Sequence, residues 1–130
     1  LLQLDADLPT VRGDRVQLQQ VLLNILLNAF DAMRACDANE REVTVRAQSR
    51  KDGFVLIAVR DTGPGLDESA IERIFQPFYT TKHDGLGMGL SICRSIINAH
   101  GGVLWAENNP ERGATCYFTV RVAQREWAPR

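Results

Sequence analysis

The segment from Val16 to Cys36 contains no glycine or proline and is rich in leucine, glutamine and alanine, so it is predicted to form one long helix. Its polar side chains fall within a sector of roughly 80° when residues are spaced about 100° apart around the helix axis. They are Gln17, Gln20, Asn24, Asn28 and Asp31. Nearly every other position is apolar, and we therefore expect a largely buried helix that carries a single polar stripe.

Two asparagines lie in the middle of this stripe. An unpaired amide that is removed from water costs about 1–3 kcal/mol, so Asn24 and Asn28 each need a partner, and a bound polar ligand would supply one. Hydrogen bonds to neighbouring backbone, or a stripe that faces solvent, are the structural alternatives. An amide oxygen is also a suitable ligand for Mg²⁺, which makes Asn24 the candidate metal ligand.

The pattern elsewhere predicts an α+β two-layer sandwich. Strands are expected at residues 1–8, 43–50, 54–60, 103–107 and 114–122, and further helices at 69–75 and 90–100. Asp14 is suited to cap the start of the long helix, and Gly101 with Gly102 to end the last one. This order predicts a mixed, mainly antiparallel sheet of about five strands, backed by about three helices on one face.

Composition narrows the functional classes. The chain has 130 residues, 45% of them hydrophobic and 24% charged, as expected for one globular domain. A net charge of -1 without a stripe of basic residues disfavours nucleic acid as a partner. Cys36, Cys93 and Cys116 are far apart and odd in number, which indicates reduced thiols and a cytoplasmic location. No apolar run is long enough to span a membrane, so no membrane contact is expected. Because the chain begins with Leu1, we expect it to be part of a longer protein.

Three glycines at alternate positions, Gly85, Gly87 and Gly89, stand directly before a helical pattern, with Met88 and Leu90 in the same run. Backbone N–H groups of such a run can approach a ligand closely, and the start of the helix adds unpaired N–H groups and a positive dipole end. This arrangement is typical of a phosphate-binding loop. An ordinary flexible loop is the alternative for this motif taken alone.

Asp61 follows a predicted core strand and opens the run Asp61-Thr62-Gly63-Pro64-Gly65. A carboxylate accepts a hydrogen bond from the exocyclic amine of adenine, whereas guanine presents a carbonyl there, so this position is suited to base recognition. Gly63 and Gly65 would let the backbone pass close to the base. A turn without a ligand is the alternative for this motif taken alone.

Together these motifs resemble the catalytic and ATP-binding domain of sensor histidine kinases. The resemblance extends from about Gly13 to Val122. The matching runs look like the N, G1, F, G2 and G3 boxes in family order, and they are Gln20 to Ala32, Asp61 to Gly65, Phe75 to Phe78, Gly85 to Leu90 and Gly113 to Thr115. Residues 79–82 and 91–96 look most like the subgroup of oxygen-, dicarboxylate- and nitrogen-responsive kinases.

The resemblance implies the Bergerat ATP-binding fold, with Mg·ATP held between the long helix and a lid. By position, Asn24 would ligate Mg²⁺, and Asn28 would contact the phosphates or the water shell of the metal. Asp61 would recognise adenine, with support from Thr115 through its hydroxyl or a water. The other ATP-binding positions would be Asp31, Gly63, Gly65, Lys82, Gly85, Gly87, Met88, Gly89 and Leu90. A solvated charge on the lid is the alternative for Lys82.

Several aromatic and polar residues complete the comparison. Phe75 and Phe78 would anchor the lid or dock it on a partner domain, and packing in the core is their structural alternative. Gln20 stands where related ATPases of this fold carry a glutamate that activates water. A neutral amide cannot accept that proton, so transfer to a protein acceptor is favoured over hydrolysis. His83 is expected in solvent and His100 at a helix C-terminus, and neither has the context of a phosphoacceptor.

The predicted function is that of a two-component histidine kinase, with residues 1–124 as its catalytic domain and residues 125–130 as a tail. With ATP and Mg²⁺ as cofactors, it would transfer the γ-phosphoryl to a histidine on a separate dimerisation domain of the same parent. The downstream partner would be a response regulator. The alternatives are a serine kinase of the anti-sigma-factor type, which would also be a binding protein, and a nucleotide-sensing module without activity.

Overall fold

Five strands form one mixed sheet in a computed structural model that describes residues 1–76 and 89–123. Their order across the sheet is β1-β2-β3-β5-β4. The strands are β1 (Leu2–Leu4), β2 (Val43–Ser49), β3 (Phe54–Asp61), β4 (Leu104–Asn108) and β5 (Ala114–Arg121). β1 is parallel to β2, and every other neighbouring pair is antiparallel. The predicted mixed, mainly antiparallel sheet is confirmed.

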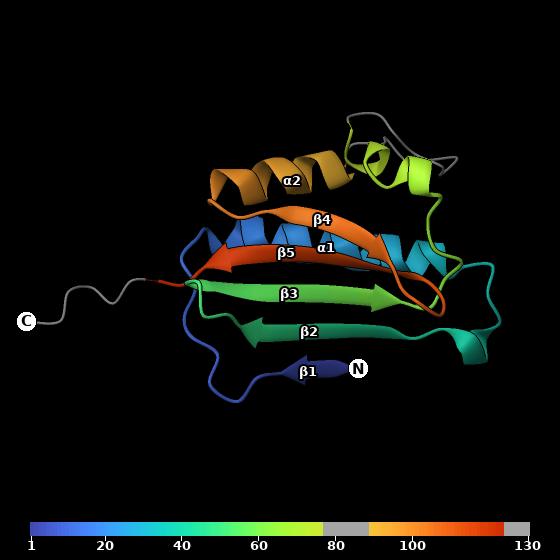
Figure 1. Cartoon of the computed structure of the whole chain (residues 1–130), viewed down its shortest axis with the longest axis horizontal. Coiled ribbons are helices and arrows are strands. Elements are labelled where there is room, and N and C mark those ends of the chain that lie inside the picture. The colour runs from blue at the N-terminus through green and yellow to red at the C-terminus, as the bar shows by residue number, and fades with distance from the viewer. Residues whose placement is uncertain (77–88, 124–130) are drawn as a thin grey trace, which may run out of the picture.

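The helices lie on one face of this sheet, as Figure 1 shows. α1 (Arg15–Ala32) packs behind β3, and α2 (Gly89–Ala99) packs beside α1 and β4. Three short 3₁₀-helices are also present in the described residues, η1 (Ala38–Glu40), η2 (Glu68–Ala70) and η3 (Arg73–Phe75). No helix within residues 1–76 and 89–123 is long and apolar enough to cross a membrane.

Two predicted boundaries of the first half of the chain are wrong. α1 ends at Ala32 instead of Cys36, because the N–H groups of Met33, Arg34 and Cys36 bond carbonyl oxygens three residues back, at 3.2, 3.1 and 3.0 Å, and form turns. The Arg41 guanidinium binds the carbonyl oxygens of Arg34 and Cys36 in these turns, at 2.8 and 3.0 Å. β1 ends at Leu4 instead of continuing to residue 8. Just beyond it the Asp5 carboxylate accepts the Ser49 N–H at 2.9 Å, a side-chain bond that replaces a further backbone pair.

The single helix expected at 69–75 is also wrong, since the segment forms η2 and η3. Its N–H groups bond carbonyls three residues back, as Ala70 does to Asp67 at 2.8 Å. A segment this short makes too few α-helical bonds to offset the entropy lost in nucleation.

The prediction of a largely buried α1 is wrong as well. Only Val21, Ile25 and Ala29 are buried along the helix. Leu23 and Phe30 are 55% and 54% exposed, and Val16 and Leu27 are exposed on the same side. One sheet face and one neighbouring helix cover only part of the circumference of α1, so an apolar stripe stays in contact with solvent.

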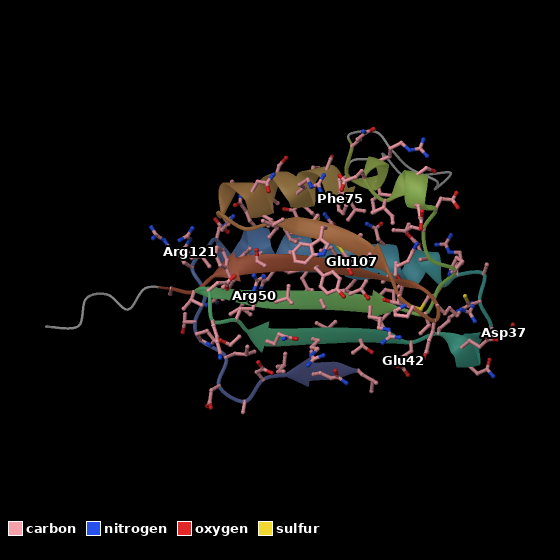
Figure 2. All side chains as sticks on the ribbon, viewed as in Figure 1. Asp37, Glu42, Arg50, Phe75, Glu107 and Arg121 are labelled. Atoms are coloured by element: carbon pink, nitrogen blue, oxygen red, sulfur yellow. The ribbon has the colours of Figure 1, made fainter. Side chains whose placement is uncertain are left out.

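The core lies between the sheet and the two helices. It includes Val59 of β3, Phe118 of β5, Leu104 of β4 and Ile97 of α2. Phe75, labelled in Figure 2, is 4% exposed and belongs to this core, with the Arg94 guanidinium 4.2 Å above its ring. Core packing, the structural alternative for Phe75, is therefore confirmed.

Asp14 caps α1 as predicted, because its Oδ1 accepts the Gln17 N–H at 3.0 Å. The Asp14 N–H in turn donates to His100 Nε2 at 3.0 Å, and His100 Nδ1 lies 2.7 Å from the Ile96 carbonyl oxygen at the end of α2. His100 thus joins the start of α1 to the end of α2.

Asp14→Ala is expected to lower the free energy of unfolding by about 1 kcal/mol, because one N–H of the first turn loses its acceptor. Urea titration followed by far-UV circular dichroism measures this change. Asp67→Ala is the matched control, since Asp67 precedes η2 without making a capping side-chain bond. An equal loss in both variants would contradict the capping role.

Candidate functional site

Three parts of the fold lie together at one end of the sheet, on the right in Figure 1. They are the C-terminal ends of α1 and β3, and the turn between β4 and β5 with the start of β5. Asp31, Asp61 and Thr115 belong to these elements. The first turns of α2, which include Leu90, lie beside the middle of α1, where Cys93 Sγ bonds the Val21 carbonyl oxygen at 3.8 Å.

Asp61 is the buried acid of this end and is 8% exposed. Its Oδ1 accepts the Gly63 N–H at 2.9 Å and the Ala114 N–H at 3.3 Å. Burial raises the pKa of this carboxyl, and the two N–H donors oppose that shift. Both donors among the described residues end on Oδ1, which leaves Oδ2 for a ligand.

Two glycines allow the backbone to close around Asp61. A Cβ on Gly63 would lie 2.9 Å from the Ala32 carbonyl oxygen, and a Cβ on Gly113 would lie 2.1 Å from the Asp61 carbonyl oxygen. Gly113 also has a φ of 82°, which a side chain disfavours. Gly65 lies in the same loop beside the Asn108 side chain. The end of α1, the end of β3 and the start of β5 are therefore in direct contact here.

The sequence analysis missed two residues that hold this loop. Asn108 Oδ1 accepts the Leu66 N–H at 2.8 Å, and its Nδ2 donates to the Leu66 carbonyl at 2.7 Å. Asn109 Nδ2 donates to the Asp61 carbonyl at 3.1 Å. The sequence marks both asparagines as turn residues, and nothing in it indicates that they reach the loop after β3.

The Thr115 hydroxyl makes no direct hydrogen bond to Asp61, and its expected support for Asp61 through a water stays a prediction. Thr115 is the register partner of Arg60, so its side chain and that of Asp61 point to opposite faces of the sheet. Its hydroxyl donates to Asn109 Oδ1. The Ala114 N–H contacts the carboxylate instead, and Thr115 is connected to Asp61 through Asn109.

The polar stripe of α1 runs along the side of the helix towards this end. Asn24, Asn28 and Asp31 are half-buried, and Gln20 is exposed. Asp31 pairs with Arg34 at 3.1 Å. The stripe is therefore partly open to solvent, which agrees with the alternative that the stripe faces solvent.

The Asn24 side chain also has a protein partner, the buried thiol of Cys93 on α2. Asn24 lowers the pKa of Cys93, against burial, which raises it. The thiol itself donates to the Val21 carbonyl oxygen at 3.8 Å. An amide also carries an oxygen, and the Asn24 oxygen is the atom of this side chain that is suited to a cation.

An oxygen donor of this kind fits Mg²⁺. Within residues 1–76 and 89–123, no group of three or more His, Cys, Asp or Glu side chains is arranged to hold a metal ion. Mg²⁺ bound with a nucleotide takes most of its ligands from phosphate oxygens and water and needs few from the protein. A single amide oxygen from α1 is enough for such an ion.

Part of the predicted site lies outside the described residues. Lys82, Gly85, Gly87 and Met88 fall in 77–88, as do Phe78 and His83. Gly89 and Leu90 are described and form the first turn of α2. Gly89 is exposed with open space where a Cβ would stand, whereas Leu90 packs against the core.

The three cysteines are free, as predicted. Cys93 is buried and Cys36 and Cys116 are half-buried. Burial also raises the pKa of Cys116, to about 12, so this thiol is protonated at neutral pH.

Comparison with known proteins identifies relatives over nearly the whole chain. Sensor protein FixL of Bradyrhizobium diazoefficiens is 47% identical over 120 residues, which are 92% of this chain and 23% of FixL. The C4-dicarboxylate transport sensor protein DctS of Rhodobacter capsulatus is 38% identical over 127 residues, 97% of this chain and 19% of DctS. The chain thus spans less than a quarter of either relative. Of the predicted subgroup of oxygen-, dicarboxylate- and nitrogen-responsive kinases, these matches confirm the likeness to the oxygen and dicarboxylate sensors.

Solved structures of histidine kinases also match this chain. The catalytic domain of histidine kinase ThkA superimposes with a TM-score of 0.81 at 35% identity, covering 93% of this chain and 76% of that domain. ThkA in complex with the response regulator protein TrrA matches with a TM-score of 0.78 at 31% identity, covering 97% of this chain and 34% of the ThkA chain.

Residues 13–124 match the family described as histidine kinase-, DNA gyrase B-, and HSP90-like ATPase. The chain therefore belongs to this ATPase family and, within it, to the catalytic domains of sensor histidine kinases.

Proposed function

We propose that this domain binds Mg·ATP at the end of the sheet around Asp61 and transfers the γ-phosphoryl to a histidine on a separate helical domain of its parent protein. The observation that carries this proposal is the Asp61 carboxylate, which is buried at the end of β3 with both of its N–H donors on Oδ1. Oδ2 receives neither donor, and because no buried side-chain oxygen of the described residues lacks a hydrogen-bond partner, Oδ2 is open to a ligand that brings its own N–H group.

Adenine supplies that group through its exocyclic amine, which would donate to Asp61 Oδ2. Guanine places a carbonyl oxygen at the equivalent position, and two acceptors would then face each other in a buried site. The close packing of Gly63 against the Ala32 carbonyl oxygen supports this binding mode, because it holds the loop that carries the Gly63 N–H donor in place beside Asp61. The site would thus select adenine nucleotides.

The phosphates would lie along the polar stripe of α1. The Asn24 oxygen would ligate Mg²⁺, Asn28 would contact the phosphates or the metal-bound water, and Asp31 would line the nucleotide. When bound, Mg²⁺ neutralises charge on the phosphate oxygens. We also assign Lys82, Gly85, Gly87, Met88, Gly89 and Leu90 to the phosphate side, on the strength of the sequence motif.

Transfer is proposed over hydrolysis because of Gln20. This side chain is an exposed member of the polar stripe on α1, and its neutral amide cannot take a proton from water. In the transfer step the bond between the γ-phosphorus and its bridging oxygen breaks, a phosphorus–nitrogen bond forms on the acceptor histidine, and ADP leaves.

A response regulator is the proposed next partner, supported by the complex of ThkA with TrrA. We place this reaction in the cytoplasm, where ATP and Mg²⁺ are available.

Incubation of the domain with γ-labelled ATP and the helical domain of its parent is expected to label one histidine. The label should be lost in acid and retained in alkali, as for phosphohistidine, and absent when that histidine is replaced by glutamine. Acid-stable serine phosphate as the product would instead support the kinase of the anti-sigma type. Nucleotide binding without any transfer would support the sensing module.

Asn24→Ala is expected to raise the Kd of ADP about tenfold in the presence of Mg²⁺, because the metal loses a protein ligand. In EDTA the Kd should stay within about twofold of the unmodified domain. Isothermal titration calorimetry measures both. Asn98→Ala on the exposed surface of α2 is the control. An equal loss with and without Mg²⁺ would show that Asn24 does not act through the metal.

Asp61→Asn is expected to stabilise the free domain at neutral pH while weakening ADP binding about tenfold or more. Burial raises the pKa of Asp61 above 3.8, so the stability of the unmodified domain falls as pH rises from 3.8 through that raised pKa and stays low above it. Asparagine keeps the Oδ1 acceptor, has no charge, and places an N–H group against the adenine amine.

Urea titrations between pH 3 and pH 7 would test the stability part, with exposed Asp67→Asn as a control that removes one charge elsewhere. The difference between Asp61→Asn and the unmodified domain should grow with pH over this range. A variant that is less stable at pH 7, or that binds ADP normally, would contradict the role assigned to the carboxylate.

A further inference from the structure

Asn109 makes more side-chain hydrogen bonds than a simple turn requires. It lies between β4 and β5 and is half-buried. Its Nδ2 donates to the Asp61 carbonyl at 3.1 Å and to the Arg112 carbonyl at 2.9 Å, and its Oδ1 accepts the Thr115 hydroxyl. Both partners of Nδ2 are carbonyl oxygens, which only accept, so the orientation of the amide is fixed.

One of these bonds holds the peptide group of Asp61. The paired register of β3 and β5 ends at Arg60 and Thr115, so Asp61 lies one residue beyond it. Asn109 supplies a side-chain donor at the place where the ladder no longer supplies a backbone one. Gly113 packs on the same carbonyl, which leaves the Asp61 peptide group little room to rotate.

The other hydrogen bonds of Asn109 act on the Asp61 carboxylate indirectly, through the turn between β4 and β5. Asn109 binds the Arg112 carbonyl through its side chain and the Gly113 carbonyl through its own N–H, at 2.9 Å in both cases. These two bonds shape the turn that brings the Ala114 N–H to Asp61 Oδ1. Asn109 therefore constrains both the backbone from which the Asp61 side chain starts and one of the two donors that orient its carboxylate.

We propose that Asn109 is a positioning residue that sets the base specificity of the nucleotide site by fixing the direction of Asp61 Oδ2. This inference rests on the proposed function. Both N–H groups of its side-chain amide and its Oδ1 already bond protein groups, so we assign it an action through Asp61 and not a contact with the base. Aspartate at this position would place acceptors against two carbonyls, and serine is too short to bridge them.

The test is displacement of a fluorescent ADP analogue by ADP or GDP in the presence of Mg²⁺, which gives a GDP-to-ADP ratio of Kd values for each variant. Asn109→Ala and Asn109→Ser are expected to lower this ratio about tenfold, because a displaced carboxylate no longer distinguishes amine from carbonyl. Thr115→Val removes the partner of Oδ1 and leaves the turn sequence intact. It should shift the ratio in the same direction by a smaller factor, and it keeps the test decisive if the Asn109 variants do not fold.

Thr119→Val is the matched control for lost stability. Thr119 lies on β5 with a buried hydroxyl that accepts the Val103 N–H at 2.9 Å, and it makes no bond to Asp61 or Asn109. The GDP-to-ADP ratio of Kd values for Thr119→Val should equal that of the unmodified domain. An unchanged ratio in folded Asn109 variants, or in Thr115→Val when those do not fold, would overturn the inference alone. Absence of ADP binding by the unmodified domain would overturn the proposed function as well.

Discussion

The site depends on keeping one carboxylate inside the protein at the point where a strand ends. Asp61 is held by N–H donors from two directions, Gly63 in the loop that follows it and Ala114 at the start of β5. Neither donor could come so close if Gly63 or Gly113 carried a side chain. The Ala32 carbonyl packs on Gly63 as well, so the end of α1 is placed by the same contacts.

The buried charge of Asp61 lowers the stability of the free domain, and in the proposed complex the same charge favours binding of the nucleotide. Burial raises the pKa of Asp61, which means that the charged carboxylate destabilises the folded domain at neutral pH relative to a neutral side chain. The two N–H donors offset part of this effect, and both of them end on Oδ1. In the proposed complex the adenine amine offsets more of it through Oδ2. The lower stability of the free domain at neutral pH and the selectivity for adenine then have the same origin, the buried carboxylate of Asp61.

The sequence predicts the order of the elements well, because each depends on local pattern. Alternating apolar residues mark β2, β3, β4 and β5, and the run without glycine or proline marks α1. Asp61 could be chosen as a site residue for a similar reason, since it follows a core strand and precedes two glycines. These features are visible within short windows of the chain.

What the sequence could not predict depends on register and on long-range packing. The opposite orientations of Thr115 and Asp61 follow from the pairing of Thr115 with Arg60, which no local pattern fixes. The roles of Asn108 and Asn109 need the β4–β5 turn to meet the loop after β3. The length of α1 was overestimated because the segment after Ala32 forms turns, and Arg41, which is distant from the helix in the sequence, binds two carbonyls of these turns.

The polar stripe becomes more exposed from Asn28 to Gln20, and this change fits transfer of the γ-phosphoryl to an acceptor on another domain. In the proposed binding mode the base lies at the buried end, near Asp61, and the phosphates extend along the stripe from Asn28 to Asn24. The stripe is half-buried at these two residues and exposed at Gln20, so the γ-phosphoryl would lie at its open end. A hydrolase would need a base that activates water at that end, and Gln20 cannot serve as one. An open end beside a neutral side chain instead leaves room for a histidine that arrives on another helix and supplies its own nitrogen nucleophile.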